Sequence, residues 1–132
     1  MNQELQDKIV NDFPELFINY KDQRDTFWIP DGWFDLVYNL SAEINSIRNS
    51  IQHKSEDDFI VVQIKIKFAG LRFYMNKTTN AMDEFIASAE NQSYNICHTC
   101  GFDSYSRYLN SYVDRKHNNL CDTCSMVKNI IE

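Results

Sequence analysis

Residues 59–76 read FIVVQIKIKFAGLRFYMN, and this stretch decides the fold. Apolar and polar side chains alternate along it, with a break at Ala69-Gly70. Alternation with a period of two indicates a β-strand that buries one face. Because the break divides the stretch in two, we expect two antiparallel strands joined as a hairpin.

The two faces of the expected hairpin differ in chemistry. One face is predicted to pack on helices through Val62, Ile64, Ile66, Phe68, Leu71, Phe73 and Met75. The outer face is predicted to carry Lys65, Lys67, Arg72 and Tyr74. Two strands alone are marginally stable, so a third strand or a covering helix is required.

A long helix is predicted directly upstream of the hairpin. From Trp33 to Ile51, apolar residues recur every three or four positions and form one stripe. Polar residues, Arg48 among them, fill the positions between and are expected to face solvent. The preceding Pro-Asp-Gly segment is typical of a turn, and its Asp31 is a candidate N-cap.

Further elements are expected on both sides of this unit. The spacing of Leu5, Ile9 and Phe13 predicts an N-terminal helix. Residues 27–29 form a short apolar run that suits an edge strand, and Asn80 is placed to cap a helix after the hairpin. Helices around a short antiparallel sheet define an α+β fold.

Four cysteines form two Cys-x-x-Cys pairs, Cys97/Cys100 and Cys121/Cys124. Two such pairs supply four thiolates for a tetrahedral Zn²⁺ site, so we predict structural zinc. A thioredoxin-like redox pair is disfavoured because no βαβ pattern surrounds it, and disulfides require an oxidising compartment. His98 and His117 are alternative ligands that could replace a cysteine. Residues 1–94 are therefore expected to form the core, and residues 95–132 a zinc ribbon with a short C-terminal helix.

The charge distribution limits the expected partners. The chain carries a net charge of −6, yet residues 59–76 contain three basic residues and no acidic residue. An acidic chain repels nucleic acids at long range, so general nucleic-acid binding is disfavoured. The basic outer face of the hairpin is either an ordinary solvated surface or a local site for nucleic acid or a signalling nucleotide. Its sequence does not match the RNP1 pattern of RNA-recognition motifs.

The sequence contains no recognisable catalytic signature. Patterns for a nucleophile triad, a P-loop, a dinucleotide fingerprint and a zinc deaminase are absent. Asp31 and Asp35 are explained as a helix cap and a helix-surface residue. No apolar run approaches the ~18 residues of a membrane span, and no signal peptide is visible, so we expect a cytoplasmic protein with no membrane partner.

Three stretches resemble a family of small, mostly uncharacterised proteins encoded by bacteriophages and prophages. These are DGWFDL at residues 31–36, QIKIKFAGLRFY at 63–74 and CHTCG at 97–101. Relatives typically carry two glycines before the Leu-Arg-Phe-Tyr run; here Ala69 takes the first place, so we expect Gly70 to supply the positive φ of the turn. The resemblance implies phage origin and a host-cytoplasm setting, and no established activity.

The expected function is therefore non-enzymatic. A small zinc-stapled phage protein is expected to bind and modulate a host protein, for example a defence or transcription component. The alternative is nucleic-acid or nucleotide binding through Lys65, Lys67, Arg72 and Tyr74.

Overall fold

The structure is a computed structural model of the chain, and it describes residues 1–20, 26–101, 120–121 and 124. Most of the expected zinc ribbon of residues 95–132 lies outside the described residues, and this part includes His117 and the expected C-terminal helix.

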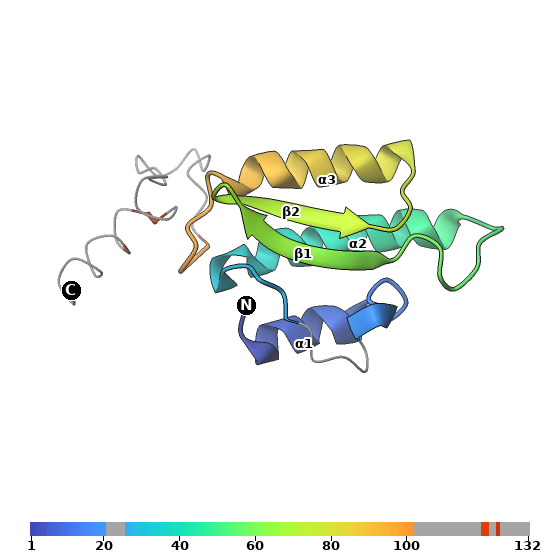
Figure 1. The fold of residues 1–132 in the computed structure, drawn as a ribbon, viewed down its shortest axis with the longest axis horizontal. Helices are drawn as coiled ribbons and strands as arrows, with labels where there is room; N and C mark the ends of the chain where they lie inside the picture. The colour runs from blue at the N-terminus through green and yellow to red at the C-terminus, as the bar shows by residue number, and fades with distance from the viewer. Residues whose placement is uncertain (21–25, 102–119, 122–123, 125–132) are drawn as a thin grey trace.

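Helices surround one antiparallel hairpin in the described part of the chain (Figure 1). In chain order the elements are α1 (Gln3–Asp12), η1 (Ile18–Tyr20), η2 (Asp31–Trp33), α2 (Phe34–Ser50), β1 (Val61–Lys67), β2 (Gly70–Met75) and α3 (Asn80–Ser93), where η marks a short 3₁₀ helix. This arrangement confirms the predicted α+β class.

The helices begin at residues that satisfy their first backbone amides. The side chain of Asn2 accepts a hydrogen bond from the amide of Leu5 at the start of α1, and Thr79, one residue before the predicted Asn80, caps α3. The predicted cap of α2 is wrong. Asp31 lies in η2, and its carboxylate accepts hydrogen bonds from the backbone and side-chain amides of Asn2 instead.

The hairpin has the predicted alternation, but its buried face is narrower than expected, and Ile66, predicted on that face, is 39% exposed. Ile64 pairs with Phe73 in the register, and both side chains are buried with Leu71. A bulge between Val61 and Gln63 inserts Val62 as an extra residue, which leaves its side chain 45% exposed. The prediction that Val62 packs on the helices is therefore wrong.

The turn of the hairpin also differs from the prediction. Phe68 and Ala69 both have positive φ, 53° and 63°, as the central residues of a type I′ turn must. Phe68 is 82% exposed and does not join the buried face. Gly70 does not have positive φ. Its lack of a side chain serves packing instead, because a Cβ there would lie 2.4 Å from the ring of Tyr94.

The outer edge of β2 is covered by α3. The amide of Leu71 donates to the hydroxyl of Ser93 at 2.9 Å, and the amide of Phe73 donates to the carboxylate of Glu90 at 3.0 Å. These side chains satisfy backbone donors that an uncovered edge would present to another chain.

The outer edge of β1 is covered by residues 27–29. The amide of Trp28 donates to the carbonyl of Ile64 at 3.2 Å, and the amide of Ile66 donates to the carbonyl of Trp28 at 3.0 Å. Trp28 thus forms a single parallel bridge with Lys65. The predicted edge strand is present in this minimal form.

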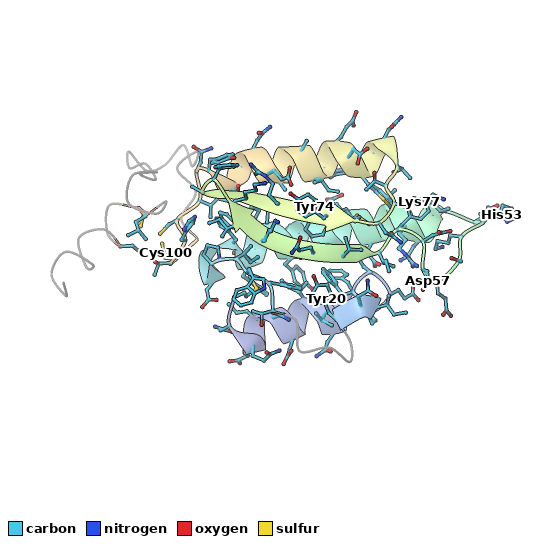
Figure 2. The ribbon with its side chains drawn as sticks, viewed as in Figure 1. Tyr20, His53, Asp57, Tyr74, Lys77 and Cys100 are labelled. Carbon is cyan, nitrogen blue, oxygen red and sulfur yellow. The ribbon has the colours of Figure 1, made fainter. Side chains whose placement is uncertain are left out.

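The hydrophobic core lies between the hairpin and the helices. Its largest fully buried side chains include Phe17, Phe27 and Trp33. In Figure 1, α2 crosses behind the hairpin, α3 runs along β2, and α1 lies below β1. No described helix crosses in front of the hairpin, and Tyr74 is labelled on this open side in Figure 2.

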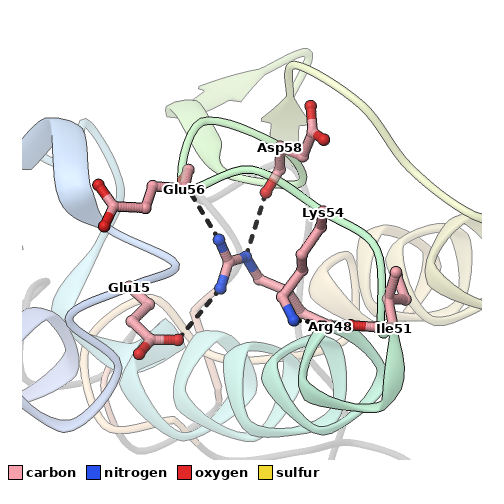
Figure 3. Close-up of polar contacts among 6 residues, drawn as sticks. All are labelled: Glu15, Arg48, Ile51, Lys54, Glu56 and Asp58. Carbon is pink, nitrogen blue, oxygen red and sulfur yellow. Dashed lines mark hydrogen bonds and ion pairs between the residues drawn. The ribbon is translucent and has the colours of Figure 1, made fainter.

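Arg48 contradicts the predicted solvent position, because it is only 3% exposed. Its guanidinium donates to the carbonyls of Asp58 at 3.1 Å and Glu56 at 3.2 Å, and to the carboxylate of Glu15 at 3.1 Å (Figure 3). One side chain therefore joins the end of α2 to the loop before β1 and to the segment after α1.

Candidate metal centre

The four cysteines come together at one end of the molecule. The Sγ atoms of Cys97, Cys100, Cys121 and Cys124 all lie within 4.8 Å of one another, and Cys100 and Cys121 approach to 3.6 Å. A regular tetrahedron with Zn–S bonds of about 2.3 Å places neighbouring sulfurs about 3.8 Å apart. The thiols therefore lie together at a spacing that can hold a metal ion.

The first cysteine pair is shaped by a tight backbone turn. The amide of Gly101 donates to the carbonyl of Cys97 at 3.0 Å, and Gly101 has a φ of 79°. A positive φ at this point is easy for glycine and costly for other residues. The turn brings Cys97 and Cys100 to the same side, where both can reach one ion.

The turn at residues 97–101, which we call the knuckle, docks on η2, directly before α2, through backbone contacts. The amide of Gly32 donates to the carbonyl of His98 at 2.7 Å. A Cβ on Gly32 would lie 2.1 Å from the carbonyl oxygen of Cys97, a distance that real atoms do not adopt. Gly32 is therefore required by this contact, which no local sequence pattern reveals.

The surroundings shift the pKa values of Cys97 and Cys124 in opposite directions. Burial raises the pKa of Cys97, but backbone amides of Cys100, Cys121 and Thr99 hydrogen-bond to its sulfur and outweigh burial, so its pKa is lowered to about 7. Burial and the neighbouring thiols raise the pKa of Cys124 above its ordinary value. Since the thiolate is the form that binds a metal, these amides favour the binding form of Cys97.

His98 packs against the core and is not part of the cysteine cluster. Its ring centroid lies 4.9 Å from that of Trp33, with the rings at 88°. Burial lowers the pKa of His98 to about 4, so the imidazole is neutral near pH 7. Trp33, the first residue of the predicted apolar stripe, is fully buried, and its ring contacts the knuckle through His98.

The predicted basic surface is brought together on the open side of the hairpin. Lys65 pairs with Arg72 across the strands, and the Nζ of Lys65 lies 5.6 Å from the centroid of the Tyr74 ring. Arg72 donates to the hydroxyl of Tyr94 at 3.3 Å, which holds the guanidinium beside β2. Lys67 lies at the turn end, with its Nζ 5.6 Å from the centroid of the Phe68 ring.

Trp28 belongs to this surface, and the sequence prediction missed it. The parallel bridge to Lys65 places both side chains on the same face, and Trp28 is 69% exposed. Its neighbours Phe27 and Ile29 are buried. The alternation expected of an edge strand would have placed the side chain of Trp28 on the face opposite to those of Phe27 and Ile29, but three apolar residues do not show which face is outside.

A groove runs between α2 and α3 and ends at the knuckle. Its volume is about 470 Å³, and both Gly32 and Gly101 line the knuckle end. Leu36 and Phe85 contribute apolar surface. Asp35 and Glu43 line the α2 side, and no basic residue lines the groove in the described part of the chain. The groove is thus partly apolar and negatively charged.

Among the described residues, no helix has both the length and the apolar character needed to cross a bilayer. Comparisons with protein-family models, with curated proteins and with solved structures gave no match.

Proposed function

We propose that this chain is a zinc-stapled interaction protein that binds a host protein and has no enzymatic activity of its own. The zinc would be held by Cys97, Cys100, Cys121 and Cys124 in a C-terminal zinc ribbon. Four thiolates complete the tetrahedral coordination of Zn²⁺, so the ion would stabilise the structure and leave no position for a substrate. The resemblance to phage-encoded proteins supports a partner in the host cytoplasm, such as a defence or transcription component.

The observation that carries the proposed partner is the groove between α2 and α3. Its volume of about 470 Å³ is within the range of binding pockets, which is about 300–1,000 Å³. Its apolar surface at Leu36 and Phe85 suits an apolar side chain, and Asp35 and Glu43 suit a basic one. We infer that the partner presents a basic segment with an apolar anchor. Because the knuckle closes one end of this groove, the zinc would also fix the shape of the site.

The test is a pull-down from host lysate with matched variants. Phe85→Glu places a charge in the groove, and Ala87→Glu makes a similar change at an exposed position of α3 outside it. We expect the wild-type chain and Ala87→Glu to retain the same protein, and Phe85→Glu to lose it. The proposal fails if no specific protein is retained, or if both variants retain it equally.

A further inference from the structure

A second surface of the molecule has a chemistry opposite to that of the groove. We define the sheet face as Trp28, Lys65, Lys67, Arg72 and Tyr74, which lie on the open side of the hairpin. The register places Trp28, Lys65 and Arg72 in one row across three neighbouring segments. Tyr74 lies next to this row, close to Lys65. The face thus alternates flat aromatic rings with cations.

The exposure of Trp28 has no explanation in the packing of the fold. A tryptophan that is 69% exposed forgoes the free energy that its burial would provide. The side chain is not on a free terminus or a loose loop, because the backbone of Trp28 is held by hydrogen bonds to Ile64 and Ile66 of β1. The buried side chains of Phe27 and Ile29 fix the segment on both sides. The indole is therefore presented on a rigid support.

The sheet face is basic, although the chain as a whole is acidic. The chain has a net charge of −6, yet the face carries Lys65, Lys67 and Arg72. The ion pairs of the described residues, Lys8 with Asp12 and Arg48 with Glu15, involve none of these cations. The carboxylate of Glu90 lies near Arg72, but it accepts a hydrogen bond from the amide of Phe73. None of the three cations is thus in an ion pair in the described part of the chain, although the guanidinium of Arg72 donates to the carbonyl of Leu71 and the hydroxyl of Tyr94.

The covered edges restrict how a ligand can bind. An extended peptide commonly adds to a free sheet edge through backbone hydrogen bonds. Here α3 covers the edge of β2, and Trp28 covers part of the edge of β1. A ligand must therefore bind across the face through side chains. Phosphate recognition alone would need the cations but not an exposed indole beside them.

We propose that the sheet face binds single-stranded nucleic acid, with bases stacking on Trp28 and Tyr74 and phosphates contacting Lys65, Lys67 and Arg72. Proteins that bind single strands combine aromatic platforms with cations in this way. A duplex keeps its bases stacked within the helix, so it would offer the face only phosphates. This activity goes beyond the proposed function, and it uses a surface separate from the groove.

The test is fluorescence anisotropy with a labelled single-stranded oligonucleotide of about 12 nucleotides, as DNA and as RNA, at about 50 mM salt. We expect binding that weakens as salt increases, and a much weaker interaction with the duplex of the same sequence. Trp28→Ala should reduce affinity by about 5- to 150-fold, the range of one lost stacking contact. Trp28→Phe keeps an aromatic ring and should retain most of the affinity.

The cations and the controls complete the test. Changing Lys65 and Lys67 together to Gln should weaken binding and lower its dependence on salt. Lys8→Gln on α1 removes one exposed positive charge away from the face and should change little. The proposal is overturned if no binding occurs up to about 100 μM, the weak limit of non-specific affinity. The proposal is also overturned if the chain binds the duplex as tightly as the single strand, or if Trp28→Ala binds the single strand as tightly as the wild-type chain. If Trp28→Ala instead abolishes capture of a host protein, the face is a protein interface.

Discussion

The amide of Gly32 donates to the carbonyl of His98 at 2.7 Å, and this hydrogen bond joins η2, directly before α2, to the cysteine knuckle. The contact is between backbones, because a Cβ on Gly32 would overlap the carbonyl oxygen of Cys97. The position of the first two cysteines is therefore set in part by the core. The groove between α2 and α3 depends on the same contact.

Gly32→Ala is expected to displace the knuckle. The added methyl group meets backbone atoms that cannot rotate away, so we expect a loss of stability of about 1–3 kcal/mol, as for overpacked sites. Amide hydrogen exchange should increase over residues 95–101. Asn49→Ala, at an exposed position of α2, should change stability by less than about 0.5 kcal/mol. Unchanged exchange in the knuckle of Gly32→Ala would contradict the docking described.

Substitution of the two turn residues of the hairpin is expected to stabilise the protein. Phe68 and Ala69 have positive φ, which costs most residues about 1–2 kcal/mol and glycine very little. Replacing the pair with Asn-Gly, the preferred type I′ sequence, should raise the free energy of unfolding by about that amount. Denaturant unfolding measures the change. A destabilised variant would show that the turn is of another type.

The hydrogen bonds from Arg48 to the loop before β1 are expected to contribute more to stability than its ion pair with Glu15. Arg48→Met leaves the carbonyls of Glu56 and Asp58 without their charged donor, at a cost of about 1.5–3 kcal/mol for each lost hydrogen bond. Glu15→Gln removes only an exposed partner and should cost less than about 1 kcal/mol. Chemical denaturation of both variants separates the two contributions. Similar losses would mean that the ion pair, and not the loop contacts, holds Arg48.

A pH dependence is expected at Asp12. A hydrogen bond of 2.6 Å from the hydroxyl of Tyr38, followed by one from Lys8, lowers the pKa of Asp12 below its ordinary value. Its contribution to stability is therefore present above the pKa of the unfolded chain and is lost as pH falls through the folded value. In Tyr38→Phe the pKa of Asp12 should rise, as NMR titration of the carboxyl carbon would show. An unchanged pKa would remove Tyr38 as the main cause.

The sequence predicted the elements whose pattern is local. The period of two in residues 59–76 gave the hairpin, and the apolar stripe from Trp33 gave α2. It could not place Arg48, because the burial of this side chain depends on a loop that folds back onto α2. Nor could alternation reveal the bulge at Val62, which shifts the register by one residue.

In the candidate sites too, the features with a local sequence pattern were predicted, and those that depend on contacts between distant segments were not. The spacing of the cysteines predicted that they would converge, because Cys-x-x-Cys pairs are recognised from spacing alone. The register of the hairpin brought Lys65, Arg72 and Tyr74 together as expected. Trp28 was missed, because its place depends on which edge of the sheet residues 27–29 join. The role of Gly32 was hidden for a similar reason, since the knuckle is more than sixty residues away in sequence.

Chelation should affect the knuckle before the core. Removing the proposed zinc would leave four thiols that no longer share an ion, so hydrogen exchange should increase first over residues 95–101 and at the second cysteine pair. The hairpin and α2 should keep their protection, because they are held by the hydrophobic core. Simultaneous loss of protection throughout the chain would contradict this order.

The most direct test of the central claim is X-ray absorption at the zinc edge, combined with the metal content of the purified chain. We predict about one zinc per chain with four sulfur ligands at about 2.3 Å. Cys97→Ser and Cys124→Ser should each reduce the sulfur coordination or lose the metal. A chain without bound metal, a disulfide between the cysteines, or a zinc ion with mainly nitrogen and oxygen ligands would contradict the account.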